Sequence, residues 1–193
     1  MRGIPLGITL AEYRAITPFS DNGYINPRSA CSDQPMPDGV RLEDVPPHDT
    51  EVGVVSCQWF SDMPGLSFKM VTRHFIALGE GSGPPGFAFI SDGRAQRLFR
   101  IGFKANSDYY AGIHAALFQN YGAPKVVTSI FLTQAGGQFP NATSTWDNGV
   151  SSIVLEQRCG QTDRYCLTYR HKALSQVYDR LIAERARLRG AKI

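Results

Sequence analysis

The chain has 193 residues, of which 42% are hydrophobic and 19% are charged. This balance predicts a globular protein that buries a sizeable core. The net charge is only +3, and residues 171–193 hold six basic residues against two acidic ones. A nucleic-acid-binding protein usually has a basic face with interleaved aromatic residues, so we expect no nucleic-acid partner. No stretch reaches the ~20 apolar residues of a membrane span.

A short helix is expected near the start of the chain. Thr9 and Glu12 have the spacing of a capping box, in which the Thr hydroxyl and the Glu carboxylate each satisfy a backbone amide at the helix start. Leu10 and Tyr13 share one face of this helix, and Pro18 ends it.

Residues 17–50 are expected to form a long irregular loop. They hold half of the twelve prolines, and six acidic residues against two basic ones. Long loops in compact domains are usually functional or disordered. We therefore expect this loop to contact a protein partner, although an ordinary covering loop is the alternative. We also expect that deletion of residues 20–48 leaves the fold intact.

Antiparallel strands joined by tight turns are predicted through the middle of the chain. β-branched and aromatic residues indicate strands in four ranges: 52–60, 67–78, 87–90 and 97–103. Asp92-Gly93 lies between the last two, and Asp-Gly between apolar runs is a strong hairpin signal.

The last third of the chain is expected to alternate between helix and hairpin. Apolar residues at helical spacing predict a helix over 110–121 that ends at Gly122. Strands are expected at 126–132, 143–146, 150–157 and 165–169. Asn148-Gly149 is typical of a type I′ turn. A final helix begins near His171 and is expected to fray beyond Ala183.

These elements predict an α+β fold with antiparallel sheet built from two helix-plus-hairpin units, and with the C-terminal helix packed on the sheet. A single amphipathic helix or a single hairpin is marginal in isolation, and two such units packed together solve both problems. We expect one domain over 1–193, with sub-units of approximately 1–104 and 105–193.

The four cysteines bear on where the protein works. Cys159 and Cys166 bracket a turn-like hexapeptide, within disulfide reach, and Cys31 with Cys57 completes the simplest of the three pairings of four cysteines. Disulfides predict an oxidising compartment, so we expect a periplasmic or secreted protein whose export signal is removed. Four free thiols in a cytoplasmic protein are the alternative.

Two short motifs carry a resemblance to known proteins. Residues 3–12 read Gly-Ile-Pro-Leu-Gly-Ile-Thr-Leu-Ala-Glu, and residues 121–124 read Tyr-Gly-Ala-Pro before a strand and Trp146. The first resembles the G-x-x-x-G-x-[S/T]-x-x-E start of exported bacterial proteins with helix-plus-meander repeats. Those include beta-lactamase inhibitor proteins and small outer-membrane assembly lipoproteins. The chain also resembles uncharacterised exported proteins of alphaproteobacteria. Loop 17–50 departs from the pattern.

No motif in the sequence predicts a catalytic site, a metal site or a cofactor. Gly79 to Gly83 reads G-E-G-S-G, which places Ser82 off the centre of a nucleophile elbow. The four histidines are dispersed, and no pair of acidic residues stands out. A hydrolase-like site assembled from scattered residues, with His74 or His114 beside a carboxylate in a cleft, is the alternative.

The function expected from the sequence is therefore a non-catalytic binding or structural module of the bacterial envelope. Exposed aromatic residues mark binding surfaces, and three in or near loops are the candidates for partner binding: Phe19, Tyr24 and Trp146.

Overall fold

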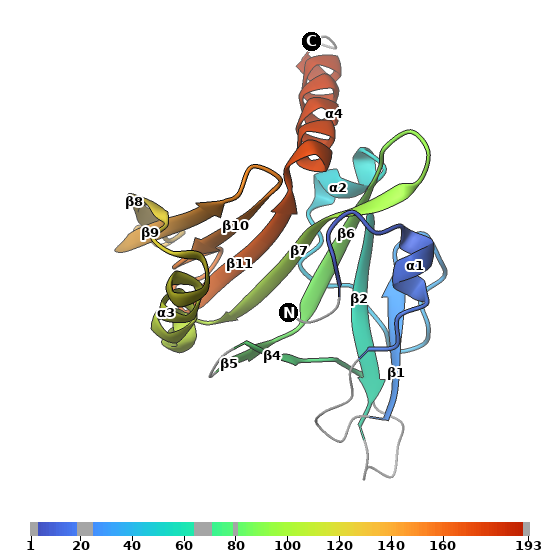
Figure 1. The fold of residues 1–193 in the computed structure, drawn as a ribbon, viewed down its shortest axis with the longest axis horizontal. Helices are drawn as coiled ribbons and strands as arrows, with labels where there is room; N and C mark the ends of the chain where they lie inside the picture. Colours follow the sequence, from blue (N-terminus) through green and yellow to red (C-terminus); the bar gives the residue numbers. More distant parts are fainter. Residues whose placement is uncertain (1–3, 19–24, 64–70, 79–80, 191–193) are drawn as a thin grey trace. The chain divides into compact units, whose positions relative to one another are not determined.

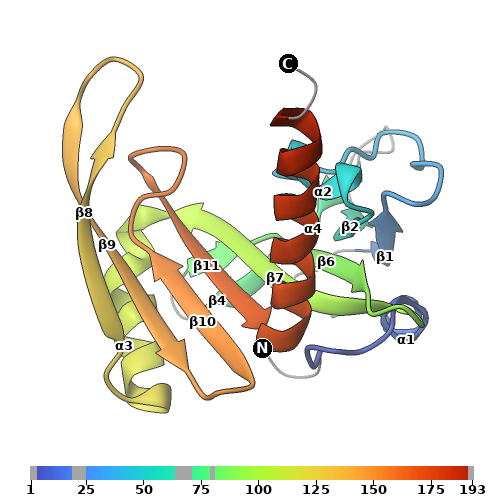
Figure 2. The same cartoon turned by 90° about the horizontal axis from the view of Figure 1, so that it is seen from above.

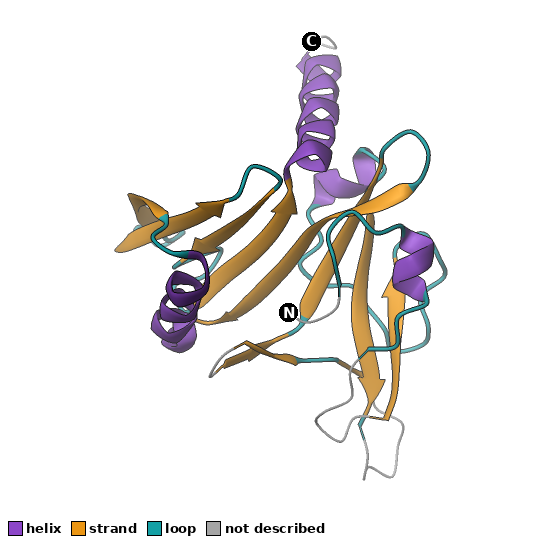
Figure 3. Cartoon of the chain, viewed as in Figure 1, coloured by secondary structure: helices purple, strands orange, loops and turns teal. Residues whose placement is uncertain are grey.

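The computed structural model describes residues 4–18, 25–63, 71–78 and 81–190 (Figure 1). Across these residues there are four α-helices and one large antiparallel sheet of nine strands, so the α+β class is confirmed. The strand order is β1-β2-β6-β7-β11-β10-β9-β8, with β3 also paired to β2, and β4 pairs with β5 in a separate two-stranded sheet. More of the described residues lie in strands than in helices (Figure 3).

The chain divides into two compact units. The first unit comprises Met1–His74, Gly86–Ile101 and His171–Ile193, and the second comprises Phe75–Pro85 and Gly102–Arg170. The sequence predicts a single boundary near residue 104. The observed units differ from that expectation in two respects. The C-terminal helix belongs to the first unit, and the short strands β4 and β5 belong to the second.

The first unit contains three helices and the strands that precede β8, apart from β4 and β5. Its elements are α1 (Leu10–Arg14), β1 (Ile25–Cys31), α2 (Pro47–Glu51), β2 (Val55–Asp62), β3 (Val71–Arg73), β6 (Pro85–Ser91), the start of β7 (Gln96–Asn106) and α4 (Lys172–Gly190).

Strand β6 of the first unit is buried on both faces. Phe87 and Phe89 lie on one face, with ring centroids 4.9 and 5.0 Å from that of Tyr13 on α1. Ala88 and Ile90 lie on the other face, in a cluster with Leu174 of α4. Two covered faces explain why this strand reads as a continuous apolar run. The C-terminal helix therefore packs on the sheet as expected.

The capping box of α1 and the Asp-Gly hairpin are both present. The Thr9 hydroxyl accepts from the Glu12 amide, and the Glu12 carboxylate accepts from the Thr9 amide at 2.7 Å. Between β6 and β7, the Asp92 carboxylate accepts from the amides of Arg94 and Ala95. These bonds lower the pKa of Asp92 to about 2.

Residues 17–50 differ from the expected irregular loop. They contain β1, and α2 begins at Pro47. Val40 packs with Ala30 and Phe60 in a small buried cluster. The high proline content predicted an irregular loop, but proline is tolerated at a bulged position of an edge strand and in the first turn of a helix. Pro27 stands at such a bulged position, in β1.

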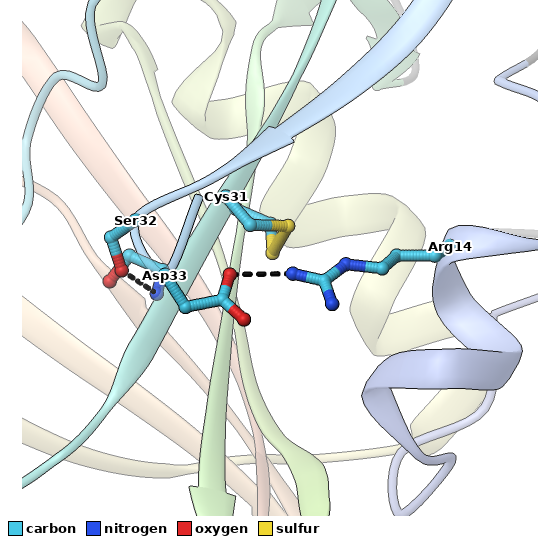
Figure 4. The surroundings of a disulfide bond; sticks show 6 residues. Arg14, Cys31, Ser32 and Asp33 are labelled. Carbon is cyan, nitrogen blue, oxygen red and sulfur yellow. Dashed lines mark hydrogen bonds and ion pairs between the residues drawn. A yellow bond between two sulfur atoms is a disulfide. The ribbon is translucent and has the colours of Figure 1, made fainter. Parts of the chain in front are cut away.

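Both expected disulfides are formed. Cys31 of β1 and Cys57 of β2 stand directly opposite each other and are bonded, as are Cys159 and Cys166. Beside the first bond, Arg14 of α1 donates to Asp33 at 2.5 Å (Figure 4). The end of β1 is thus tied covalently to β2 and by an ion pair to α1.

The second unit is built around a meander of its last four strands, with a helix on one face. Its elements are β4 (Ile76–Leu78), β5 (Gly81–Gly83), the end of β7, the 3-10 turn η1 (Ser107–Tyr109), α3 (Tyr110–Tyr121), β8 (Lys125–Leu132), β9 (Gln138–Asp147), β10 (Ser151–Glu156) and β11 (Arg164–His171). The Asn148-Gly149 turn joins β9 to β10 as expected, with a Gly149 φ of 87°.

Helix α3 buries only part of its apolar stripe. Ile113 and Leu117 are buried, whereas Phe118 and Tyr121 are exposed. Beneath the helix, Ile153 and Leu155 of β10 are buried together with Leu167 of β11. The helix bounds match the expected 110–121.

Candidate interaction surface at the edge strand β8

The aromatic residues expected to bind a partner do not form a surface. Trp146 is only 5% exposed, so the expected exposure was wrong. Its Nε1 donates to the Gly122 carbonyl at 2.8 Å, and its ring lies 5.7 Å from that of His114. Trp146 pairs with Ile153 on the face of the sheet that α3 covers. Phe19 and Tyr24 lie outside the described residues.

The residues considered for an enzyme are not arranged around an accessible nucleophile. The Ser61 hydroxyl lies 2.8 Å from Nδ1 of His74, which is the pairing that nucleophilic catalysis requires. However, Ser61 is fully buried and His74 is 2% exposed. The His114 ring makes tilted contacts with the rings of Tyr110 and Trp146. Within the described ranges, no His, Cys, Asp or Glu residues gather in threes that could hold a metal ion.

A buried carboxylate in the first unit holds three elements together. Asp49 of α2 is fully buried, and its carboxylate accepts from Arg100 of β7 and from the Tyr178 hydroxyl of α4, the latter at 2.7 Å. Burial and this hydrogen bond to Asp49 raise the pKa of Tyr178 to about 12. The cluster joins α2, β7 and α4 and therefore stabilises their packing.

Strand β8 of the second unit presents apolar side chains to solvent on both of its faces. Val126, Val127, Ile130 and Leu132 are 51%, 55%, 57% and 65% exposed. Because side chains alternate along a strand, Val126, Ile130 and Leu132 share one face, and Val127 lies on the other. We call the edge of β8 (Lys125–Leu132) that faces away from β9 the β8 edge.

β8 is the last strand of the sheet, paired only with β9 among the described residues. Its register runs from Lys125 opposite Thr145 to Leu132 opposite Gln138. In Figure 2 the β8–β9 hairpin forms one margin of the meander, and its connecting turn reaches beyond the β10–β11 turn.

The hydrogen-bond pattern shows which backbone groups of β8 face outward. At the hairpin turn, the Thr133 amide donates to the Gly137 carbonyl at 2.9 Å. Bonded and non-bonded pairs alternate along an antiparallel ladder. The odd-numbered residues of β8 therefore bond to β9, and the even-numbered residues direct their N–H and C=O groups away from it.

The next strand in the sheet confirms this assignment. The carbonyl of Ala142, which stands opposite Thr128, accepts from the Gln157 amide on the far side of β9. Ala142 and Thr128 therefore form a non-bonded pair, as the alternation requires. Pro140, opposite Ile130, also falls at a non-bonded position, where the missing N–H of proline removes no β8–β9 bond.

The two end strands of the large sheet differ in how well their free edges are protected. β1 carries Pro27, Arg28 and a register shift between Ile25 and Arg28. Proline, charge and bulges are the devices by which natural proteins block strand addition at an edge. β8 has none of them inside the strand, and its only charged residue, Lys125, stands at its start. This contrast identifies the β8 edge as the candidate functional surface.

Sequence reasoning predicted strand 126–132 but not its position at the end of the sheet. The available signal was a run of apolar residues without an internal charge, yet a buried central strand gives the same signal. Only the pairing order shows that β8 is an end strand.

Comparisons of the chain with family models, curated proteins and solved structures find no match. The resemblance to exported helix-plus-meander proteins stays a prediction. Across the described residues, no helix combines the length and apolar character needed to cross a membrane.

Proposed function

We propose that this chain is a non-catalytic binding or structural module of an oxidising compartment, the bacterial periplasm or the exterior, and that it binds a protein strand at the β8 edge. Strand addition gives affinity through backbone hydrogen bonds and specificity through alternate side chains. The outward N–H and C=O groups of β8 are the observation that carries this proposal.

The exposed side chains of β8 support the same function. An added strand would cover Ile130 and Leu132 on one face and Val127 on the other, which are among the more exposed large apolar side chains described. Removal of apolar area from water stabilises such a complex by about 25 cal/mol per Å² before the costs of association.

The disulfides support the proposed compartment. All four cysteines are paired, and disulfides persist mainly in exported proteins. The buried Ser61–His74 pair gives an enzyme less support, because a fully buried hydroxyl is not accessible to a substrate carbonyl in this conformation.

A labelled peptide with the sequence of residues 124–133 tests strand addition. We expect the protein to bind this peptide in fluorescence anisotropy at low protein concentration. Thr128→Pro should abolish binding, because it removes an outward amide but no β8–β9 hydrogen bond, and Thr128→Ala should retain it. A peptide N-methylated at every residue should not bind, since neither of its edges can donate backbone hydrogen bonds.

Two results would contradict the proposal. One is the absence of peptide binding by the unmodified protein. The other is equal binding by the Thr128→Pro and Thr128→Ala proteins, which would place the peptide elsewhere. Val150→Lys is the matched surface control, because Val150 is 65% exposed in the same unit but lies outside β8.

The expected partner surface in loop 17–50 stays a second proposal. Residues 32–39 are exposed throughout, between the buried Cys31 and Val40. The structure changes how this surface is tested, since deletion of 20–48 would remove β1 and leave Cys57 unpaired. A photo-crosslinking residue at Met36, compared with one at Ile130 and one at Val150, separates the two surfaces by the position that forms adducts in exporting cells.

A further inference from the structure

We propose that the strand bound at the β8 edge comes from a second copy of this chain, paired antiparallel about a two-fold axis that passes by Ser129. This inference rests on the proposed strand addition and names its occupant. A two-fold interface requires a surface that is complementary to itself, and the sequence and register of β8 meet that requirement.

Backbone pairing fixes the centre of the proposed interface. The outward groups belong to Val126, Thr128, Ile130 and Leu132, and antiparallel pairing must match them with one another. Centred on Ser129, Val126 pairs with Leu132 of the other copy and Thr128 pairs with Ile130. Every outward residue of both strands then has a partner.

A shifted centre pairs fewer groups. With the axis at Thr128, Leu132 would stand opposite Pro124, which has no N–H to donate. With the axis at Ile130, Val126 would stand opposite a residue of the hairpin turn, beyond Thr133. The arrangement centred on Ser129 is the one that uses the whole length of β8.

The side chains are also complementary in this arrangement. Directly opposed residues of antiparallel strands share a face, and apolar pairs there are favourable, whereas opposed like charges are not. Val126 meets Leu132 on one face, and Val127 meets Phe131 on the other. Lys125 stands opposite Thr133, so the two lysines lie at opposite ends of the interface and no charges of one sign face each other.

An unrelated strand would have to supply this match by its own sequence, while a second copy supplies it by symmetry. The apolar faces of β8 carry no internal charge that would repel the same strand in another molecule. A long apolar edge left open is a site of uncontrolled aggregation, and a defined two-fold contact covers it.

Sedimentation equilibrium over a concentration series tests the association with the full chain. We expect the weight-average mass to rise from 21.3 kDa toward twice that value. Thr128→Pro should stay at the monomer mass, while Thr128→Ala should associate like the unmodified protein. Circular dichroism of the two variants should agree, which separates loss of pairing from loss of folding.

Cysteine cross-linking tests the register. Ser129→Cys should form an intermolecular disulfide under mild oxidation, because the two copies of residue 129 are directly opposed and fall within the 4.4–6.8 Å Cα separation of disulfides. Thr128→Cys should not, because its counterpart is offset by two residues. Cross-linking of Thr128→Cys but not Ser129→Cys would overturn the proposed register.

The outcomes distinguish this inference from the proposed function. A chain that stays monomeric at all concentrations but binds the 124–133 peptide would overturn the second-copy inference and leave strand addition standing. A chain that does neither would overturn both. Dimers that persist in Thr128→Pro would show association through another surface and would overturn the inference.

Discussion

Asp49 is the residue on which the packing of α2 depends. Its fully buried carboxylate accepts from Arg100 and from Tyr178, so its removal leaves a guanidinium and a hydroxyl without their partner. Removal of one member of a buried ion pair is strongly destabilising, whereas exposed ion pairs contribute little.

We expect Asp49→Ala to lower the free energy of unfolding by roughly 3 kcal/mol, measured by urea titration. Arg189→Ala is the matched control. Arg189 also forms an ion pair, with Glu51, but it is exposed, and its loss should cost less than about 1 kcal/mol. Equal effects of the two substitutions would show that the Asp49 cluster does not stabilise the fold.

Tyr178 makes the stability depend on pH at the alkaline end. Its pKa is about 12 in the folded chain, mainly because of burial and its bond to Asp49, and about 10 in an unfolded chain. Between these values the unfolded chain loses the proton and the folded chain keeps it. The free energy of unfolding should therefore fall as the pH rises through this window.

Tyr178→Phe should reduce this fall, because phenylalanine has no proton to lose. The measurement is the free energy of unfolding at several pH values from 9 upward. Burial also raises the pKa of Tyr169 to about 12, so the slope should become smaller rather than vanish. Identical slopes in the two proteins would exclude a contribution from Tyr178.

At the scale of elements, the β4–β5 hairpin depends on one glycine. A Cβ at Gly81 would lie 2.7 Å from Cγ of Tyr109, which is closer than real Cβ atoms come to other atoms. Gly81→Ala should therefore lower the free energy of unfolding by about 1–3 kcal/mol, the usual cost of overpacking.

Gly102→Ala is the matched control, because Gly102 lies in the same unit and a Cβ there meets no atom within 4 Å. Chemical denaturation of both variants gives the comparison. In the background of Tyr109→Ala the added cost of Gly81→Ala should become smaller, because the ring is gone, but should not vanish, because the Cβ of residue 109 would still lie 2.9 Å from the new Cβ. An undiminished cost there would show that the Tyr109 ring is not the cause.

Local sequence patterns predicted most of these elements, since helix caps and tight turns are decided by neighbouring residues. The Thr9 capping box, the helix ending at Gly122 and the Asn148-Gly149 turn are present. Trp146 and β1 were missed because burial and edge position depend on strand pairing across the chain, which no local pattern contains. The β8 edge was missed for the same reason.

At the scale of the whole molecule, the two disulfides close chain loops of different length. On the loop-entropy relation, the 26-residue separation of Cys31 and Cys57 predicts a contribution of about 3.5 kcal/mol, and the seven-residue separation of Cys159 and Cys166 about 2.4 kcal/mol.

We expect no reactive thiol in the unreduced protein, before or after denaturation, in a thiol-reagent assay. Alanine replacement of Cys31 and Cys57 together should lower the free energy of unfolding more than replacement of the other pair. Free thiols in the native protein would contradict the proposed oxidising compartment. A larger loss from the Cys159–Cys166 pair would show that loop entropy does not decide the difference.

The covalent bond between β1 and β2 also limits how far any assembly can grow. Because β1 carries Pro27, it does not readily pair with a strand of another molecule. Because Cys31 bonds it to β2, it also cannot separate from β2 to exchange with a second molecule. Of the two end strands β1 and β8, only β8 is then open to strand addition. We therefore expect the proposed association through β8 to stop at a finite complex rather than to propagate into a fibre.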